Sequence, residues 1–64
     1  MIGYVAKDKS GQVYLHLEEP QYEEEYEGWF SYIDCLNITG QFSEFDNINY
    51  EDKPIKVVIK LKQL

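Results

Sequence analysis

The sequence predicts a mainly β fold: a small antiparallel sheet of three to five strands with at most one or two short helical turns, and an α+β arrangement as the alternative. Apolar and polar residues alternate in three runs, residues 2–7, 13–18 and 55–61, which is typical of strands with one buried face. The chain has 64 residues, which allows a single small domain over residues 1–64. Its composition is 44% hydrophobic and 16% aromatic, so a folded core is expected.

The first two runs predict a β-hairpin over residues 2–18. Between them, residues 8–11 read Asp-Lys-Ser-Gly, a turn composition in which glycine supplies positive φ. On the second strand, Leu15 and Leu17 are expected to face the core. His16 then falls on the opposite face, where we expect it in solvent.

Residues 20–28 leave two alternatives open. Tyr22, Tyr26 and Trp29 recur at helical spacing, and Pro20 fits the first turn of a helix. Against a helix, the segment is short, and it carries four mutually repelling glutamates: Glu23, Glu24, Glu25 and Glu27. The segment is therefore either a one- to two-turn helix that caps the sheet or an ordered acidic loop, and Gly28 ends it in both cases.

The second half of the chain predicts two further strands. Residues 29–34 form the third strand candidate, which residues 35–38 extend. The sequence Ser43-Glu44-Phe45-Asp46 resembles a capping box and predicts a short helical or 3-10 turn that buries Phe42 and Phe45. The last strand spans residues 55–61, with one apolar face and one face rich in lysine, and pairing begins after Pro54.

The charge is unevenly distributed along the chain. The net charge is -6, and every basic residue is a lysine. Residues 18–52 hold eleven acids and no lysine, whereas the flanking segments hold six lysines and Asp8, so the middle carries -11 and the ends +5. Direct binding to nucleic acid is disfavoured, because phosphate contacts need clusters of lysine and arginine. A basic protein is the expected kind of partner.

No catalytic, cofactor or metal constellation stands out. His16 and Cys35 are the only histidine and the only cysteine, so a structural zinc site is excluded. Cys35 adjoins Leu36 and follows Ile33. In this apolar stretch the cysteine is predicted to be buried as a small hydrophobic residue. Consecutive glutamates lack the spacing of a calcium loop. Glu51 and Asp52 precede Pro54 and are interpreted as turn residues. We therefore predict a protein that is not an enzyme and needs no cofactor.

The compartment is predicted from what the sequence lacks. No run approaches the roughly 20 apolar residues of a membrane span, and residues 1–11 have no apolar signal-peptide core. A lone cysteine is typical of a reducing setting. These observations predict a cytoplasmic protein without a membrane partner.

Two stretches carry a resemblance. Residues 49–57, Asn-Tyr-Glu-Asp-Lys-Pro-Ile-Lys-Val, fit an aromatic-Glu-Asp-x-Pro-(Ile/Val)-x-Val tail, and residues 3–9 and 11–15 resemble the start of the same proteins. The chain is thereby similar, over about half its length, to small proteins of gut anaerobes and their mobile elements, which have no assigned activity. Where those proteins often carry tryptophan, this chain has Tyr50. The resemblance implies a cytoplasmic accessory or phage-type protein.

Two functions remain after these exclusions. The first is a non-enzymatic protein-binding module whose acidic middle engages a basic partner, in one form as an inhibitor that mimics nucleic acid. Its expected partner-binding residues are the acidic and aromatic side chains Glu23, Glu24, Glu25, Glu27, Tyr22, Tyr26 and Trp29. The alternative is a small structural or self-assembling protein, a homo-oligomer that pairs strand edges.

Overall fold

The computed structural model describes residues 1–60. Within them the chain forms six strands and one 3-10 turn, and the mainly β fold is confirmed. The elements are β1 (Ile2–Lys7), β2 (Val13–His16), β3 (Gln21–Glu23), β4 (Gly28–Phe30), β5 (Cys35–Asn37), the 3-10 turn η1 (Ser43–Phe45) and β6 (Ile55–Val58).

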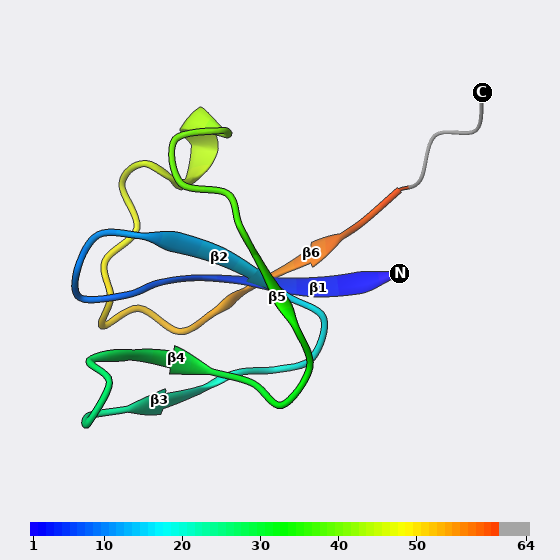
Figure 1. Ribbon diagram of the computed structural model, residues 1–64. Coiled ribbons are helices and arrows are strands. Elements are labelled where there is room, and N and C mark those ends of the chain that lie inside the picture. The colour runs from blue at the N-terminus through cyan, green and yellow to red at the C-terminus, as the bar shows by residue number, and fades with distance from the viewer. Residues whose placement is uncertain (61–64) are drawn as a thin grey trace.

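Four of the strands make one antiparallel sheet in the order β5-β2-β1-β6 (Figure 1). β1 pairs with β2 so that Val5 lies opposite Leu15, which confirms the hairpin predicted for residues 2–18. On its other side β1 pairs with β6, where Val5 lies opposite Ile55. The predicted last strand is shorter than expected, because β6 ends at Val58; Leu61 lies outside the described residues.

One face of this sheet carries the apolar core. Val5, Val13 and Ile38 are buried there, and the partly buried side chains of the segment after β5, including Phe45 and Ile48, pack against them. The predicted 3-10 turn is confirmed as η1, but Phe42 precedes it with no side-chain cap and stays 48% exposed. The expected burial of Phe42 is therefore wrong.

The opposite face is covered by a second, two-stranded sheet formed by β3 and β4 (Figure 1). Ala6 and His16 are buried on this face, at 2% and 1% exposed. The expectation that His16 faces solvent is wrong, because alternation assigns a side chain to a face but does not show that another sheet packs on that face. Leu17, expected in the core, is 46% exposed.

Residues 20–28 form neither of the two predicted alternatives, a short helix or an ordered acidic loop. They make most of a β-hairpin in which β3 and β4 are joined by a turn over residues 24–27. Tyr22 and Trp29, whose spacing suggested one helix face, lie directly opposite each other across the two strands. The third strand is likewise shorter than predicted, since β4 ends at Phe30 and β5 belongs to the other sheet.

Cys35 is exposed, which overturns the prediction that it is buried. The reason is its position on β5, an edge strand whose three residues are all exposed. Among residues 1–60, no helix has the length and apolar character to cross a membrane.

Candidate functional site

Two acidic side chains from the first hairpin bind the backbone of β4 and of the segment that follows it. Asp8, which follows β1, accepts a hydrogen bond at Oδ1 from the backbone N–H of Trp29 at 2.9 Å. Glu18, which follows β2, accepts at Oε1 from the backbone N–H groups of Tyr32 at 2.6 Å and Ile33 at 3.3 Å. Hydrogen bonds to a charged acceptor are stronger than neutral ones, so these two carboxylates act as structural anchors.

Gly28 is required by one of these anchors. A Cβ added at Gly28 would lie 2.7 Å from the carboxylate of Asp8, closer than real side chains approach each other. The absence of a side chain at Gly28 therefore lets Asp8 reach the N–H of Trp29. The sequence suggested a different role for this glycine, the end of a helix or loop.

The turn between β3 and β4 contains the one residue other than glycine that has positive φ within residues 1–60. Glu27 has a φ of 52°, in the left-handed region that costs most residues about 1–2 kcal/mol. Its carbonyl accepts a hydrogen bond from the backbone N–H of Lys9 at 3.0 Å, which ties the tip of the hairpin to the β1–β2 turn. Backbone strain of this kind is found preferentially at functional sites.

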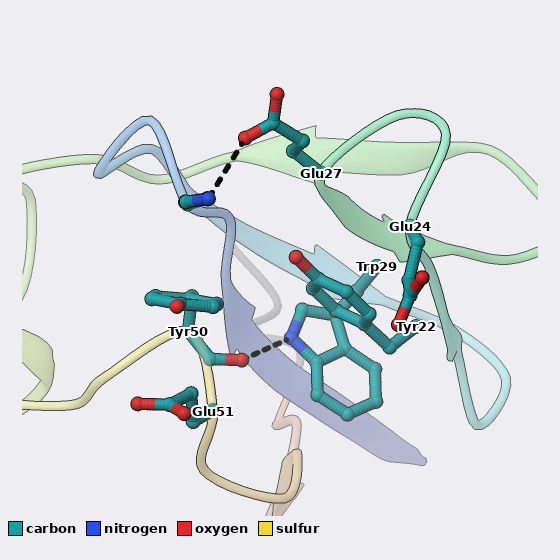
Figure 2. A pocket seen from close by; sticks show the side chains of 7 residues that line it. Tyr22, Glu24, Glu27, Trp29, Tyr50 and Glu51 are labelled. Atoms are coloured by element: carbon teal, nitrogen blue, oxygen red, sulfur yellow. Dashed lines mark hydrogen bonds and ion pairs between the residues drawn. The ribbon is translucent and has the colours of Figure 1, made fainter.

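Three aromatic rings meet beside this turn (Figure 2). Tyr22 meets Trp29 edge to face, with ring centroids 5.4 Å apart and an interplanar angle of 74°. The ring centroid of Tyr50, from the turn before β6, lies 6.2 Å from that of Tyr22. The indole N–H of Trp29 donates to the backbone carbonyl of Tyr50 at 3.0 Å, so the orientation of the indole is fixed.

These rings line a hollow of about 640 Å³, which is within the usual size range of ligand pockets. Charged side chains complete its lining, and seven residues contribute in all: Lys9, Tyr22, Glu24, Glu27, Trp29, Tyr50 and Glu51. We call this the aromatic–acidic pocket. Three carboxylates and one ammonium belong to this lining, so it carries a net charge of -2 when all four groups are ionised.

Lys9 is the single cation in the lining, and its ammonium lies close to both an acidic and an aromatic side chain. The Nζ of Lys9 lies 3.2 Å from Glu27 Oε2 and 5.9 Å from the ring centroid of Tyr50. The hydrogen bond to Glu27 and its negative charge raise the pKa of Lys9, so the ammonium stays protonated at neutral pH. Partial burial, with a smaller contribution from Tyr50, raises the pKa of Tyr22, which keeps its phenol neutral.

The pocket gathers some of the predicted partner-binding residues and leaves others elsewhere. Tyr22, Glu24, Glu27 and Trp29 line it, whereas Glu23 lines a separate hollow beside Phe30 and Tyr32. Glu25 is exposed at the tip of the turn. Tyr26 is 74% exposed and stacks on Phe30, with centroids 6.3 Å apart.

Three residues of the pocket were missed by sequence reasoning. Lys9 belongs to the β1–β2 turn, and Tyr50 and Glu51 to the turn before β6, far from the glutamate cluster in sequence. The predicted turn character of Glu51 and Asp52 agrees with the structure, because Asp52 Oδ2 accepts from the N–H of Asn49 at 2.8 Å. Only the packing of three chain segments brings these residues together, so no local pattern could have identified them.

A second cluster surrounds the buried His16. Its Nδ1 lies 2.9 Å from Ser31 Oγ, and the Ser31 hydroxyl donates to the carbonyl of Ile33 at 3.0 Å. Because serine has one hydroxyl hydrogen, which goes to Ile33, the imidazole donates to Ser31 from Nδ1, and its buried Nε2 has no partner among the described residues. Desolvation lowers the pKa of His16, opposed by the charge of Asp8.

The sheet register places Cys35 directly opposite His16, a pairing that the sequence did not suggest. No hydrogen bond joins the two side chains within residues 1–60. The same part of the chain holds no group of three or more His, Cys, Asp or Glu residues arranged for a metal ion. The aromatic–acidic pocket is therefore the strongest candidate for a functional site. Comparisons of the chain with protein-family models, with curated proteins and with solved structures find no match.

Proposed function

We propose that this protein is a non-enzymatic protein-binding module whose β3–β4 hairpin engages a basic surface of a partner protein. The observation that carries the proposal is the aromatic–acidic pocket, where three carboxylates and three aromatic rings surround one hollow. Tyrosine and tryptophan are enriched at the centres of protein interfaces. Clustered negative charge accelerates association with a positively charged partner and adds specificity.

In the most specific form of this proposal, the partner is a nucleic-acid-binding protein. Such a protein carries lysine and arginine clusters that contact phosphates, and an acidic hairpin that occupies them acts as an inhibitor. The mobile-element setting implied by the resemblance of residues 49–57 supports this form. A cytoplasmic location goes with the proposal, because a single exposed cysteine suits a reducing compartment.

The test compares two variants that lose the same charge at different places. The pocket variant carries Glu24→Gln and Glu51→Gln, and the control carries Glu19→Gln and Glu44→Gln, all at exposed positions. Each tagged protein is used to capture partners from nuclease-treated lysate of the source cells, at low and at moderate salt. We expect the wild type and the control to capture the same basic protein at low salt, and the pocket variant to lose it. Equal capture by both variants contradicts the proposal.

A self-assembling structural role is the second candidate. The observation that favours it is the sheet order, which leaves β5 and β6 as edge strands that carry the exposed side chains Leu36 and Val58. Unpaired strand edges are templates for pairing with another chain. Light scattering at about 100 µM tests it, because association grows with concentration by mass action. A monomer at that concentration counts against self-assembly.

A further inference from the structure

We propose that the aromatic–acidic pocket is a binding site for an alkylammonium group, and that Lys9 is an internal competitor which a ligand displaces. The source of that group is a lysine side chain of the protein partner, and in this respect the inference rests on the proposed function. It adds two things to that function: the group that the pocket recognises, which is a single cationic side chain, and the residue of this chain, Lys9, that regulates access to the pocket.

The position of Lys9 shows what the pocket accommodates. Its ammonium lies between a carboxylate, Glu27 at 3.2 Å, and an aromatic ring, Tyr50 at 5.9 Å from the centroid. A cation within about 6 Å of a ring centroid is attracted by the negative face of the π system. Aromatic cages built in this way recognise methylated lysine and choline. The chain thus places its own alkylammonium group where a ligand of the same chemistry fits.

Lys9 is weakly held and leaves the pocket unneutralised. The side chains of Lys9 and Glu27 are 53% and 62% exposed, and ion pairs at such exposure contribute little. The carboxylates of Glu24 and Glu51 in the lining make no hydrogen bond or ion pair with a cationic side chain of residues 1–60. A second alkylammonium group therefore finds free negative charge, and it exchanges with Lys9 at small cost.

The pocket is built to keep its shape when Lys9 moves away. The backbone N–H of Lys9 holds the carbonyl of Glu27, a bond that does not depend on the lysine side chain. Trp29 is fixed at both its backbone N–H, by Asp8, and its indole N–H, by Tyr50. A site whose walls are fixed before binding loses less conformational entropy on binding.

The test reads the pocket directly, because Trp29 is the only tryptophan of the chain. Its fluorescence is titrated with N-acetyl-lysine methylamide, with tetramethylammonium and with N-acetyl-arginine methylamide, at ionic strength held constant with sodium chloride. We expect a saturable change with the two alkylammonium probes and a weaker one with the arginine probe. Lys9→Ala is expected to tighten binding of the alkylammonium probes about two- to fivefold, the size of one exposed cation–π contact.

Two variants control for charge and for the ring. Lys56→Ala removes the same charge from an exposed position on β6. It is expected to leave the affinities for the two alkylammonium probes unchanged. Tyr50→Leu removes the ring but keeps the carbonyl that accepts from Trp29, and it is expected to abolish saturation. Its fold is checked by the far-UV circular dichroism of the sheet.

The outcomes separate this inference from the proposed function. A flat titration in both wild type and Lys9→Ala overturns the alkylammonium site, even if partner capture still depends on Glu24 and Glu51. Equal binding of the arginine probe overturns the preference for alkylammonium. Saturation by tetramethylammonium without the lysine probe overturns lysine as the source. If the lysine probe saturates the pocket but capture of a partner does not depend on Glu24 and Glu51, only the protein-partner role is overturned.

Discussion

The four-stranded sheet and the β3–β4 hairpin are stabilised by different kinds of interaction. The sheet buries the apolar side chains of Val5, Val13 and Ile38 in a shared core. In the strands of the hairpin, the only buried residue is Gly28, which has no side chain. The hairpin and the segment that follows it are joined to the sheet by hydrogen bonds, including those made by Asp8, Glu18 and His16.

The difference teaches where the molecule is robust and where it is fragile. An apolar core spreads its stabilisation over many small contacts, whereas a polar attachment depends on single atoms. We therefore expect the hairpin to open locally at a lower free energy than the sheet unfolds. Because the hairpin carries Tyr22, Glu24, Glu27 and Trp29, the candidate site lies on the less stable part of the molecule.

The largest effect is expected in the core of the sheet. Ile38→Ala removes a side chain that is 4% exposed and is expected to lower the free energy of unfolding by about 2–5 kcal/mol. The urea unfolding transition seen by circular dichroism and the one seen by Trp29 fluorescence should shift together, since the hairpin has no support without the sheet. Leu36→Ala is the matched control on β5: it is 62% exposed and should change stability by about 0.5 kcal/mol or less. Equal effects of the two variants would contradict the assignment of the core.

The next effect separates the hairpin from the sheet. Asp8→Ala leaves the N–H of Trp29 without an acceptor and is expected to cost about 1–3 kcal/mol. The loss falls on the hairpin, so the fluorescence transition should precede the circular dichroism transition. Asp8→Asn keeps an Oδ1 acceptor and should lose less. Coincident transitions in Asp8→Ala would show that hairpin and sheet unfold as one unit.

The third prediction concerns pH and His16. Burial lowers the pKa of His16 below 6.5 in the folded protein, so the unfolded chain binds the extra proton first as the pH falls. The stabilising contribution is complete above pH 6.5 and is lost as the pH falls from there through the folded-state pKa. Urea midpoints measured at about pH 7.5 and about pH 5.5 should therefore differ, with lower stability in acid.

The control for this prediction is His16→Asn, whose side-chain amide can still donate to Ser31 but does not titrate. The difference between the two pH values should shrink in this variant. An unchanged difference would contradict the assignment of the effect to His16.

The two regions also differ in how well the sequence predicted them. The first hairpin, the 3-10 turn and the last strand were predicted from alternation and local composition, because each follows from residues close in sequence. The β3–β4 hairpin was not predicted, because Tyr22 and Trp29 sit seven residues apart and fit one helix face as well as a strand pair. The prediction that His16 faces solvent was wrong for a related reason, because its burial depends on a second sheet formed by residues elsewhere in the chain.

The candidate site was predicted in part for the same physical reason. The glutamates and the rings of residues 22–29 are local and conspicuous, whereas Lys9 and Tyr50 enter the pocket through long-range packing. The sequence also counted Glu18 in the acidic middle, because it could not show that its carboxylate is engaged by the backbone N–H groups of Tyr32 and Ile33.

The smallest effect is expected at the tip of the hairpin, and its sign is opposite. Glu27 holds a φ of 52°, which costs an L residue about 1–2 kcal/mol, while glycine adopts it freely. Glycine is also more flexible in the unfolded chain, which offsets about 0.5–1 kcal/mol of that gain. Glu27→Gly should therefore stabilise the hairpin by about 1 kcal/mol or less, seen as a later Trp29 fluorescence transition in urea. Glu25→Gly in the same turn, where φ is not positive, should instead destabilise it slightly, because only the flexibility of the unfolded chain changes. Destabilisation of equal size by both substitutions would mean that the backbone at Glu27 is unstrained and that its carboxylate, through Lys9, is what secures the tip.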